Sequence, residues 1–144
     1  MIKNLFRKGE GGSDEPAVPQ GAGQKATILV VDDSPTEVHV FKKILEKQGY
    51  TILVAKDGQE GIDLAKRSHP DLILMDVVMP VLNGFQATRQ LKNSAETADI
   101  PVIMVTTKGE PVQVEEAFLA GCSDYVTKPL NKLELLEKVS KYMP

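Results

Sequence analysis

Five side chains stand at the ends of short apolar runs, and together they offer three carboxylates, one hydroxyl and one ammonium group. They are Asp32 and Asp33 after residues 27–31, Asp76 after residues 72–75, Thr106 after residues 101–105, and Lys128 shortly after Tyr125 and Val126. If the fold gathers these positions, the mutual repulsion of three carboxylates requires a nearby cation. Because all the candidate ligands are oxygen atoms, the pattern favours Mg²⁺, with Lys128 as a second positive charge.

A carboxylate held beside Mg²⁺ can attack phosphorus and form an aspartyl phosphate. The metal and Lys128 would then offset charge on the phosphoryl oxygens, and the Thr106 hydroxyl would donate a hydrogen bond to one of them. Each residue alone has an ordinary structural explanation, since an Asp after a strand often caps a helix and a Lys is usually exposed. Their recurrence at successive strand ends is what indicates a functional site.

These residues must be positioned by the elements that precede them. Strands are expected at residues 27–31, 51–55, 72–75, 101–105 and 125–126, each followed by a helical pattern. Ser34, Pro35 and Glu37 predict the first helix start, with Ser34 as N-cap and Glu37 closing a capping box. Five strand–helix units with short connections predict an α/β fold with a doubly wound parallel sheet and helices on both faces. Such sheets bind ligands at the carboxyl ends of their strands.

The composition excludes several classes of protein. The chain has 144 residues, with 17 basic and 20 acidic side chains and a net charge of −3, so nucleic acid is not an expected partner. One cysteine rules out an internal disulfide, and one cysteine with two histidines is too few for a structural zinc site, which favours a cytoplasmic location. The apolar runs fall far short of the roughly 20 residues that a membrane span needs.

The first 25 residues differ from the rest of the chain. They are rich in Gly and Pro and carry few large apolar side chains after Phe6. Such a segment cannot bury enough apolar surface to offset its ordering entropy, so residues 1–25 are expected to form a flexible tail and residues 26–144 a single domain. The tip at residues 1–8 is basic and apolar, and docking to a partner or membrane surface is an open alternative to a plain disordered tail.

Four blocks of sequence resemble the response-regulator receiver domain. They are VVDDS at residues 30–34, LILMDVVMP at 72–80, VTT at 105–107 and AGCSDYVTKP at 120–129, and the match runs from about Ile28 to Tyr142. The resemblance implies a flavodoxin-like sheet of five parallel strands in the order 2-1-3-4-5 with five helices. Shorter segments, among them SPTE at residues 34–37 and NGFQATRQL at 83–91, resemble the type IV pilus twitching-motility receivers of the PilH type.

The resemblance implies a role for each site residue. Asp76 would be the phosphoacceptor, and Asp33, Asp76 and the backbone carbonyl of Val78 would bind Mg²⁺ directly. Asp32 would act on the metal through water. Lys128 would pair with the acyl phosphate, and its bond to Pro129 would be cis. Thr106 would move to the phosphoryl oxygen, and Tyr125 would then swing inward as the second switch residue.

The implied function is a phosphorylation-gated signalling switch rather than an enzyme. A histidine kinase would supply the phosphoryl group, and an effector protein would bind the face formed by residues 111–143 of a monomer, in pilus or chemotaxis-like motility control. Two alternatives stay open: a phosphate sink for a shared kinase, and a binding module that works without phosphorylation. A phosphatase of the haloacid dehalogenase kind is disfavoured because its Asp-x-Asp motif differs from the adjacent Asp32 and Asp33.

Overall fold

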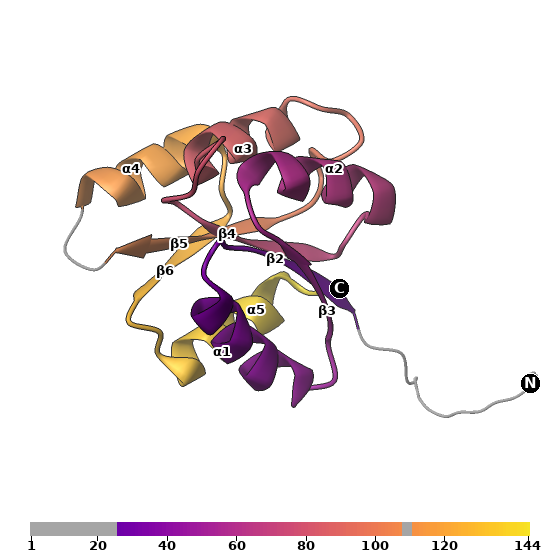
Figure 1. Cartoon of the computed structure of the whole chain (residues 1–144), viewed down its shortest axis with the longest axis vertical. Coiled ribbons are helices and arrows are strands. Elements are labelled where there is room, and N and C mark those ends of the chain that lie inside the picture. The colour runs from indigo at the N-terminus through magenta and orange to yellow at the C-terminus, as the bar shows by residue number, and fades with distance from the viewer. Residues whose placement is uncertain (1–25, 108–110) are drawn as a thin grey trace, which may run out of the picture.

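The computed structural model describes residues 26–107 and 111–144, in which strands and helices alternate (Figure 1). The strands are β2 (Thr27–Val31), β3 (Thr51–Ala55), β4 (Leu72–Asp76), β5 (Val102–Thr107) and β6 (Asp124–Lys128). The helices are α1 (Pro35–Glu46), α2 (Gly58–Ser68), α3 (Gly84–Lys92), α4 (Pro111–Ala120) and α5 (Lys132–Tyr142). The predicted tail, including its basic and apolar tip, lies outside the described residues.

The five strands form one parallel sheet in the order β3-β2-β4-β5-β6, which confirms the predicted 2-1-3-4-5 topology. The strand order reverses at β2, which lies between β3 and β4. In the register of these strands, Val31 is paired with Ala55 on one side and with Met75 on the other. Because Val31 and Met75 are paired, the residues that follow them, Asp32 and Asp76, lie side by side at the carboxyl end of the sheet.

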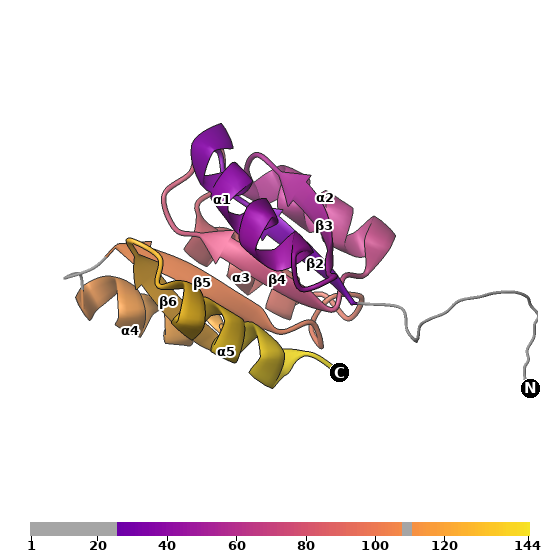
Figure 2. The same ribbon diagram turned by 90° about the horizontal axis from the view of Figure 1, so that it is seen from below.

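Helices cover both faces of the sheet. Helices α2, α3 and α4 lie on one face and α1 and α5 on the other (Figure 1), and the view from below has α1 and α5 in front of the sheet (Figure 2). Strand residues alternate between the two layers, because successive side chains of a strand point to opposite faces. Leu29 and Ile73 belong to the core beneath α2–α4, whereas Ile28 and Leu72 belong to the core beneath α1 and α5.

No helix in the described part of the chain is long and apolar enough to cross a membrane.

Two strands are longer than the sequence predicts. Strand β5 continues to Thr107, and β6 begins at Asp124, one residue before the expected Tyr125 and Val126, and ends at Lys128 as expected. The cause is parallel pairing between these strands, in which Thr106 is opposite Thr127 and Thr107 is opposite Lys128. Thr106 and Lys128 are thus held by backbone pairing at the strand ends, not by the loops beyond them.

Candidate functional site

The three predicted carboxylates lie together at the carboxyl end of the sheet. Carboxylate oxygens of Asp32, Asp33 and Asp76 all lie within 4.8 Å of one another. Asp32 and Asp76 are buried, with 1% and 6% of their surface exposed, while Asp33 faces solvent. This combination leaves the cluster open on one side, as a site for an exchangeable ion requires.

The hydrogen bonds of Asp32 test whether this cluster suits a cation. Its Oδ1 accepts a hydrogen bond from the backbone N–H of Ser34 at 2.9 Å. Its Oδ2 is buried and has no hydrogen-bond donor among the described residues. A buried carboxylate oxygen without a donor is costly unless a cation or an ordered water satisfies it. The donor set therefore fits a hard divalent ion reached directly or through water.

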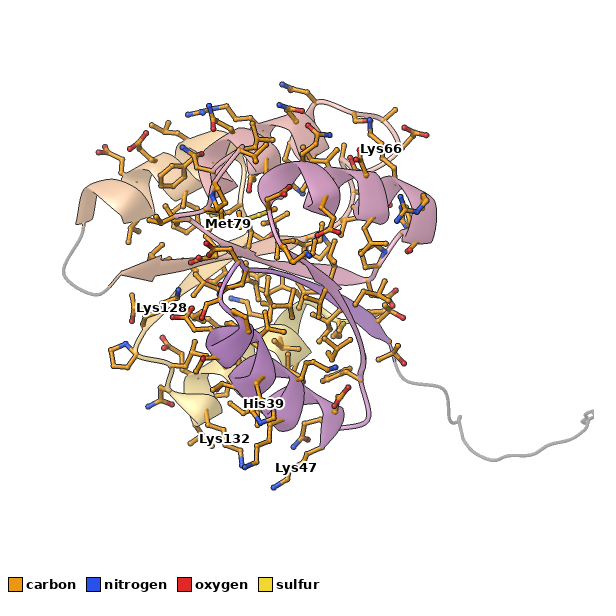
Figure 3. The ribbon with its side chains drawn as sticks, viewed as in Figure 1. His39, Lys47, Lys66, Met79, Lys128 and Lys132 are labelled. Atoms are coloured by element: carbon orange, nitrogen blue, oxygen red, sulfur yellow. The ribbon has the colours of Figure 1, made fainter. Side chains whose placement is uncertain are left out.

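Lys128 supplies the positive charge of the site from the end of β6 (Figure 3). Its Nζ atom lies 3.0 Å from Oδ1 of Asp76 and 3.9 Å from Oδ2 of Asp32. The side chain is 27% exposed, so solvent screens these pairs only in part. The peptide bond between Lys128 and Pro129 is cis, which confirms the expectation drawn from the resemblance.

Sequence reasoning missed a fourth carboxylate at the site, that of Glu37. Its Oε1 is in contact with Nζ of Lys128. The sequence predicts that Glu37 returns to the N-cap of α1, but this part of the capping box does not form. Ser34 does cap the helix, since its Oγ accepts from the Glu37 N–H at 3.3 Å. The Glu37 side chain instead reaches across to β6.

Burial and charge perturb the four ionisable groups at the centre of the site. Burial raises the pKa of Asp32 to about 7, and the nearby negative charge of Asp76 adds to this effect. Burial also raises the pKa of Asp76, although Lys128 opposes the rise. For Glu37, burial favours the neutral form, but the contact with the Lys128 ammonium group outweighs it and lowers the pKa.

The pKa of Lys128 is raised, since its bonds with Glu37 and Asp76 outweigh the effect of burial, which alone would lower it. The lysine is therefore a firmly charged ammonium group at neutral pH. Because carboxylates surround it, the site holds more negative than positive charge. A site of this kind attracts cations and accepts an anionic group only when a cation accompanies it.

The backbone at the end of β4 is fixed by Gly84, the first residue of α3. Its N–H donates to the carbonyl of Val77 at 2.9 Å. A Cβ atom at this position would lie 2.2 Å from the carbonyl oxygen of Asp76, so only glycine allows this approach. Val78 lies in the loop between Asp76 and Gly84, and its side chain is 68% exposed.

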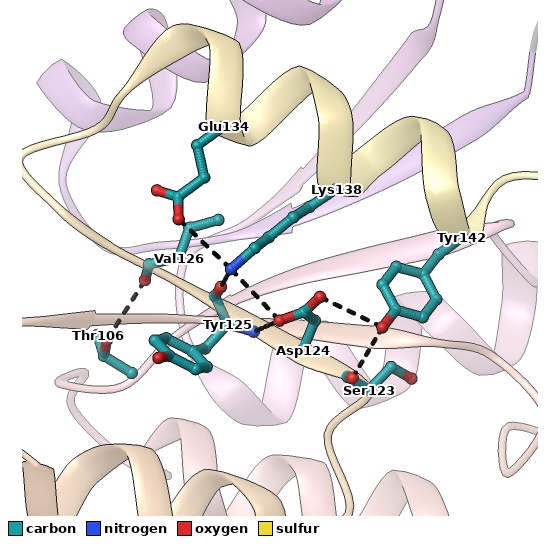
Figure 4. Close-up of polar contacts among 8 residues, drawn as sticks. All are labelled: Thr106, Ser123, Asp124, Tyr125, Val126, Glu134, Lys138 and Tyr142. Atoms are coloured by element: carbon teal, nitrogen blue, oxygen red, sulfur yellow. Dashed lines mark hydrogen bonds and ion pairs between the residues drawn. The ribbon is translucent and has the colours of Figure 1, made fainter.

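The two predicted switch residues lie on adjacent strands. Thr106 is buried, and its Oγ1 donates a long hydrogen bond of 3.4 Å to the carbonyl of Val126 (Figure 4). Tyr125 is half-buried, and its ring meets that of Phe118 edge-on, with the centroids 6.0 Å apart. A long hydrogen bond is easily exchanged for a better one, which leaves the Thr106 hydroxyl available to another acceptor.

Lys138 of α5 anchors the backbone beside Tyr125. Its Nζ contacts the carbonyl oxygen of Tyr125, lies 3.3 Å from Oδ1 of Asp124, and sits 4.7 Å from the centre of the Tyr125 ring (Figure 4). Glu134, one turn earlier in α5, lies 3.5 Å from the same ammonium group. These contacts join the backbone and the ring of Tyr125 to α5.

Comparisons with known proteins agree with this geometry. The family model described as the response regulator receiver domain matches residues 28–140. The PilH protein of Pseudomonas aeruginosa is 50% identical over 115 residues, which cover 80% of this chain and 95% of that protein.

Two solved structures are similar as well. The receiver domain of a Pseudomonas aeruginosa sensor histidine kinase, with a magnesium ion coordinated in its active-site cleft, has a TM-score of 0.75 and 31% identity, and the match covers 83% of this chain and 98% of that one. A Saccharomyces cerevisiae receiver domain, crystallised with a histidine phosphotransfer protein, has a TM-score of 0.76 and 28% identity, with coverage of 83% and 89%. With the family model matching most of its length, the chain belongs to the response regulator receiver domain family, and it is a signalling protein rather than an enzyme.

Proposed function

We propose that this protein is a phosphorylation-gated switch in which Asp76 accepts a phosphoryl group from a phosphohistidine. One observation carries the proposal: the buried Asp76 carboxylate lies in a cluster of three carboxylates and 3.0 Å from the ammonium group of Lys128. A carboxylate with this neighbour and with a site for a divalent ion beside it is placed to act as a nucleophile toward phosphorus.

Asp33, Asp76 and the backbone carbonyl of Val78 would hold Mg²⁺, and Asp32 would orient a water molecule bound to it. When bound, the ion offsets negative charge on the phosphoryl oxygens. The buried and unsatisfied Oδ2 of Asp32 supports this assignment, as does the magnesium ion in the similar kinase receiver domain.

In the transfer, a carboxylate oxygen of Asp76 forms a bond to phosphorus while the bond between phosphorus and the imidazole nitrogen of the donor breaks. The electron pair of that bond stays on the nitrogen, and the product is an acyl phosphate. Negative charge moves from the Asp76 carboxylate to the phosphoryl oxygens during the transfer. The Lys128 ammonium group would then pair with one of these oxygens, because it already lies beside Asp76. The donor is a histidine kinase or a histidine phosphotransfer protein, in line with the complex that the yeast receiver domain forms.

The output would start at Thr106. Its weak bond to the Val126 carbonyl is exchanged for one to the phosphoryl group, and Tyr125 moves into the space that the hydroxyl vacates. The effector would then recognise the changed face formed by residues 111–143. The identity of 50% with PilH supports a role in type IV pilus or related motility control.

Monophosphoimidazole tests this function without a cognate kinase, because it carries the same phosphorus–nitrogen bond as phosphohistidine. The expected result is Mg²⁺-dependent phosphorylation of the wild type, detected as a mobility shift on a phosphate-affinity gel. Asp76→Ala should show no shift, whereas Asp63→Ala, at an exposed position of α2, should match the wild type. A shift of equal size in Asp76→Ala would refute the assignment of the phosphoacceptor.

A further inference from the structure

Glu37 lies in the site, but it belongs neither to the cluster of three aspartates nor to the switch residues Thr106 and Tyr125. Its Oε1 contacts Nζ of Lys128, the same atom that lies 3.0 Å from Oδ1 of Asp76. The ammonium group thus has a carboxylate on each side, one from the first turn of α1 and one from the end of β4. The Glu37 side chain is only 39% exposed, so this is not a pair formed freely in solvent.

The local structure explains why Glu37 is directed to Lys128. In a complete capping box, the side chain three residues after the N-cap accepts a hydrogen bond from the N-cap N–H. Helix α3 has such a box, in which Gln86 accepts from the N–H of Asn83 at 3.0 Å. In α1 the N–H of Ser34 already donates to Oδ1 of Asp32. The carboxylate of Glu37 has no cap donor left and pairs with the lysine instead.

We propose that Glu37 competes with the phosphoryl group for Lys128. In the unphosphorylated protein, Glu37 holds the ammonium group; when an anionic group joins Asp76, Glu37 must yield part of that contact. The proposal rests on the proposed function, since it names the residue that opposes phosphoryl binding at the same site. Glu37 would therefore set how strongly the site holds a phosphoryl group, although it touches neither phosphorus nor the metal.

The direction of the effect follows from charge. A phosphoryl group on Asp76 raises the negative charge at that position from about one to about two units. The carboxylate of Glu37, joined to the same ammonium group, repels the added charge and shares the cation that would stabilise it. Replacement by glutamine keeps the shape and removes the charge. Because solvent screens a partly exposed carboxylate, we expect a gain in affinity of roughly threefold to tenfold.

Beryllofluoride, which mimics a phosphoryl group on a carboxylate, provides the test. It is titrated into the wild type, Glu37→Gln and Glu46→Gln at saturating Mg²⁺, and the bound form is followed by ¹⁹F NMR. Glu46 is a matched control because it is an exposed glutamate on the same helix, about 13 Å from Glu37 along the axis. The expected result is that Glu37→Gln binds beryllofluoride about threefold to tenfold more tightly, while Glu46→Gln binds like the wild type.

Each other result overturns the inference. Equal or weaker binding by Glu37→Gln would mean that the carboxylate has no effect or positions Lys128 for the phosphoryl group, and the proposed function would stand. Equal tightening in Glu46→Gln would show that only the overall charge matters. Binding by neither the wild type nor Glu37→Gln would contradict the proposed function as well as the competition, which separates the two failures.

Discussion

The Nζ atom of Lys128 lies 3.0 Å from Oδ1 of Asp76, although the strands that carry these residues are not neighbours. Strand β5 separates β4 from β6, so the lysine side chain reaches across the end of β5, where Thr106 is located. The ion pair therefore joins β4 to β6 and passes over the end of β5. A group that enters between Asp76 and Lys128 would disturb the end of β5 as well as the two residues it contacts.

Replacement of Lys128 by methionine should slow phosphorylation of Asp76 by acetyl phosphate at least tenfold. The methionine keeps the apolar part of the side chain but removes the cation that offsets charge on the phosphoryl oxygens. The initial rate is measured by intact-protein mass spectrometry. Lys132→Met, at an exposed position four residues later, should react at a rate within about twofold of the wild type. A rate for Lys128→Met above half that of the wild type would argue against the assigned role.

The stability of the metal-free protein should fall as the pH rises from about 4 to about 7. Burial raises the pKa of Asp32 from 3.8 to about 7, so in this window the folded protein holds a proton that the unfolded chain has released. When the folded state binds more protons, the free energy of unfolding decreases with rising pH. Urea denaturation at pH 5 and pH 7.5 measures the change.

Asp32→Asn is the variant that isolates this effect, because asparagine does not titrate. Its free energy of unfolding should lack the decrease between about pH 4 and about pH 7 that the Asp32 carboxyl produces. At pH 7.5 without metal, it should exceed the free energy of unfolding of the wild type. Mg²⁺ should oppose the decline in the wild type, since metal binding favours the deprotonated carboxylate. A slope in Asp32→Asn as steep as in the wild type would assign the pH dependence to another group.

Gly84→Ala should destabilise the fold by about 2 kcal/mol or more. An added Cβ would lie 2.2 Å from the Asp76 carbonyl oxygen, which belongs to the backbone and cannot move without shifting β4. Helix propensity alone predicts a gain of roughly 1 kcal/mol, so the two arguments give opposite signs. Thermal or urea denaturation decides between them. Gln90→Ala, an exposed position of the same helix, serves as the control and should change stability by less than about 0.5 kcal/mol.

Val81→Gly should stabilise the protein by roughly 0.5–1 kcal/mol. Val81 has a φ of 71° and is 80% exposed, so its β-branched side chain is strained and buries little apolar surface. Relief of this strain should outweigh the added entropy of glycine in the unfolded chain. Val78→Gly tests the explanation, because Val78 is also exposed but has no positive φ, and the same change there should be destabilising. Destabilisation by both glycines would refute the strain argument.

Much of the fold could be predicted from the sequence because the signals are local. The apolar runs end at Asp32 and Asp76, and parallel pairing then places their carboxylates together without further information. The gathering of Lys128 and Asp76 also follows from the strand order, which the resemblance supplied and the structure confirms.

The contact between Glu37 and Lys128 could not be predicted in this way, because its cause is not local to α1. The capping-box pattern is present, but the Ser34 N–H that the box needs is taken by Asp32. A signal does exist in retrospect: Glu37 stands three positions after the N-cap, and the N-cap itself directly follows two aspartates at the end of a strand. Similarly, the positive φ of Val81 has no sequence signature, since glycine or asparagine is the residue usually found in that conformation.

The most direct test of the central claim is the intact mass of the protein after incubation with acetyl phosphate. With Mg²⁺ the wild type should gain about 80 Da, the mass of one phosphoryl group. The gain should disappear when the metal is chelated, and it should be absent in Asp76→Ala. An unchanged mass of the wild type, or an equal gain in Asp76→Ala, would contradict the claim that Asp76 accepts the phosphoryl group.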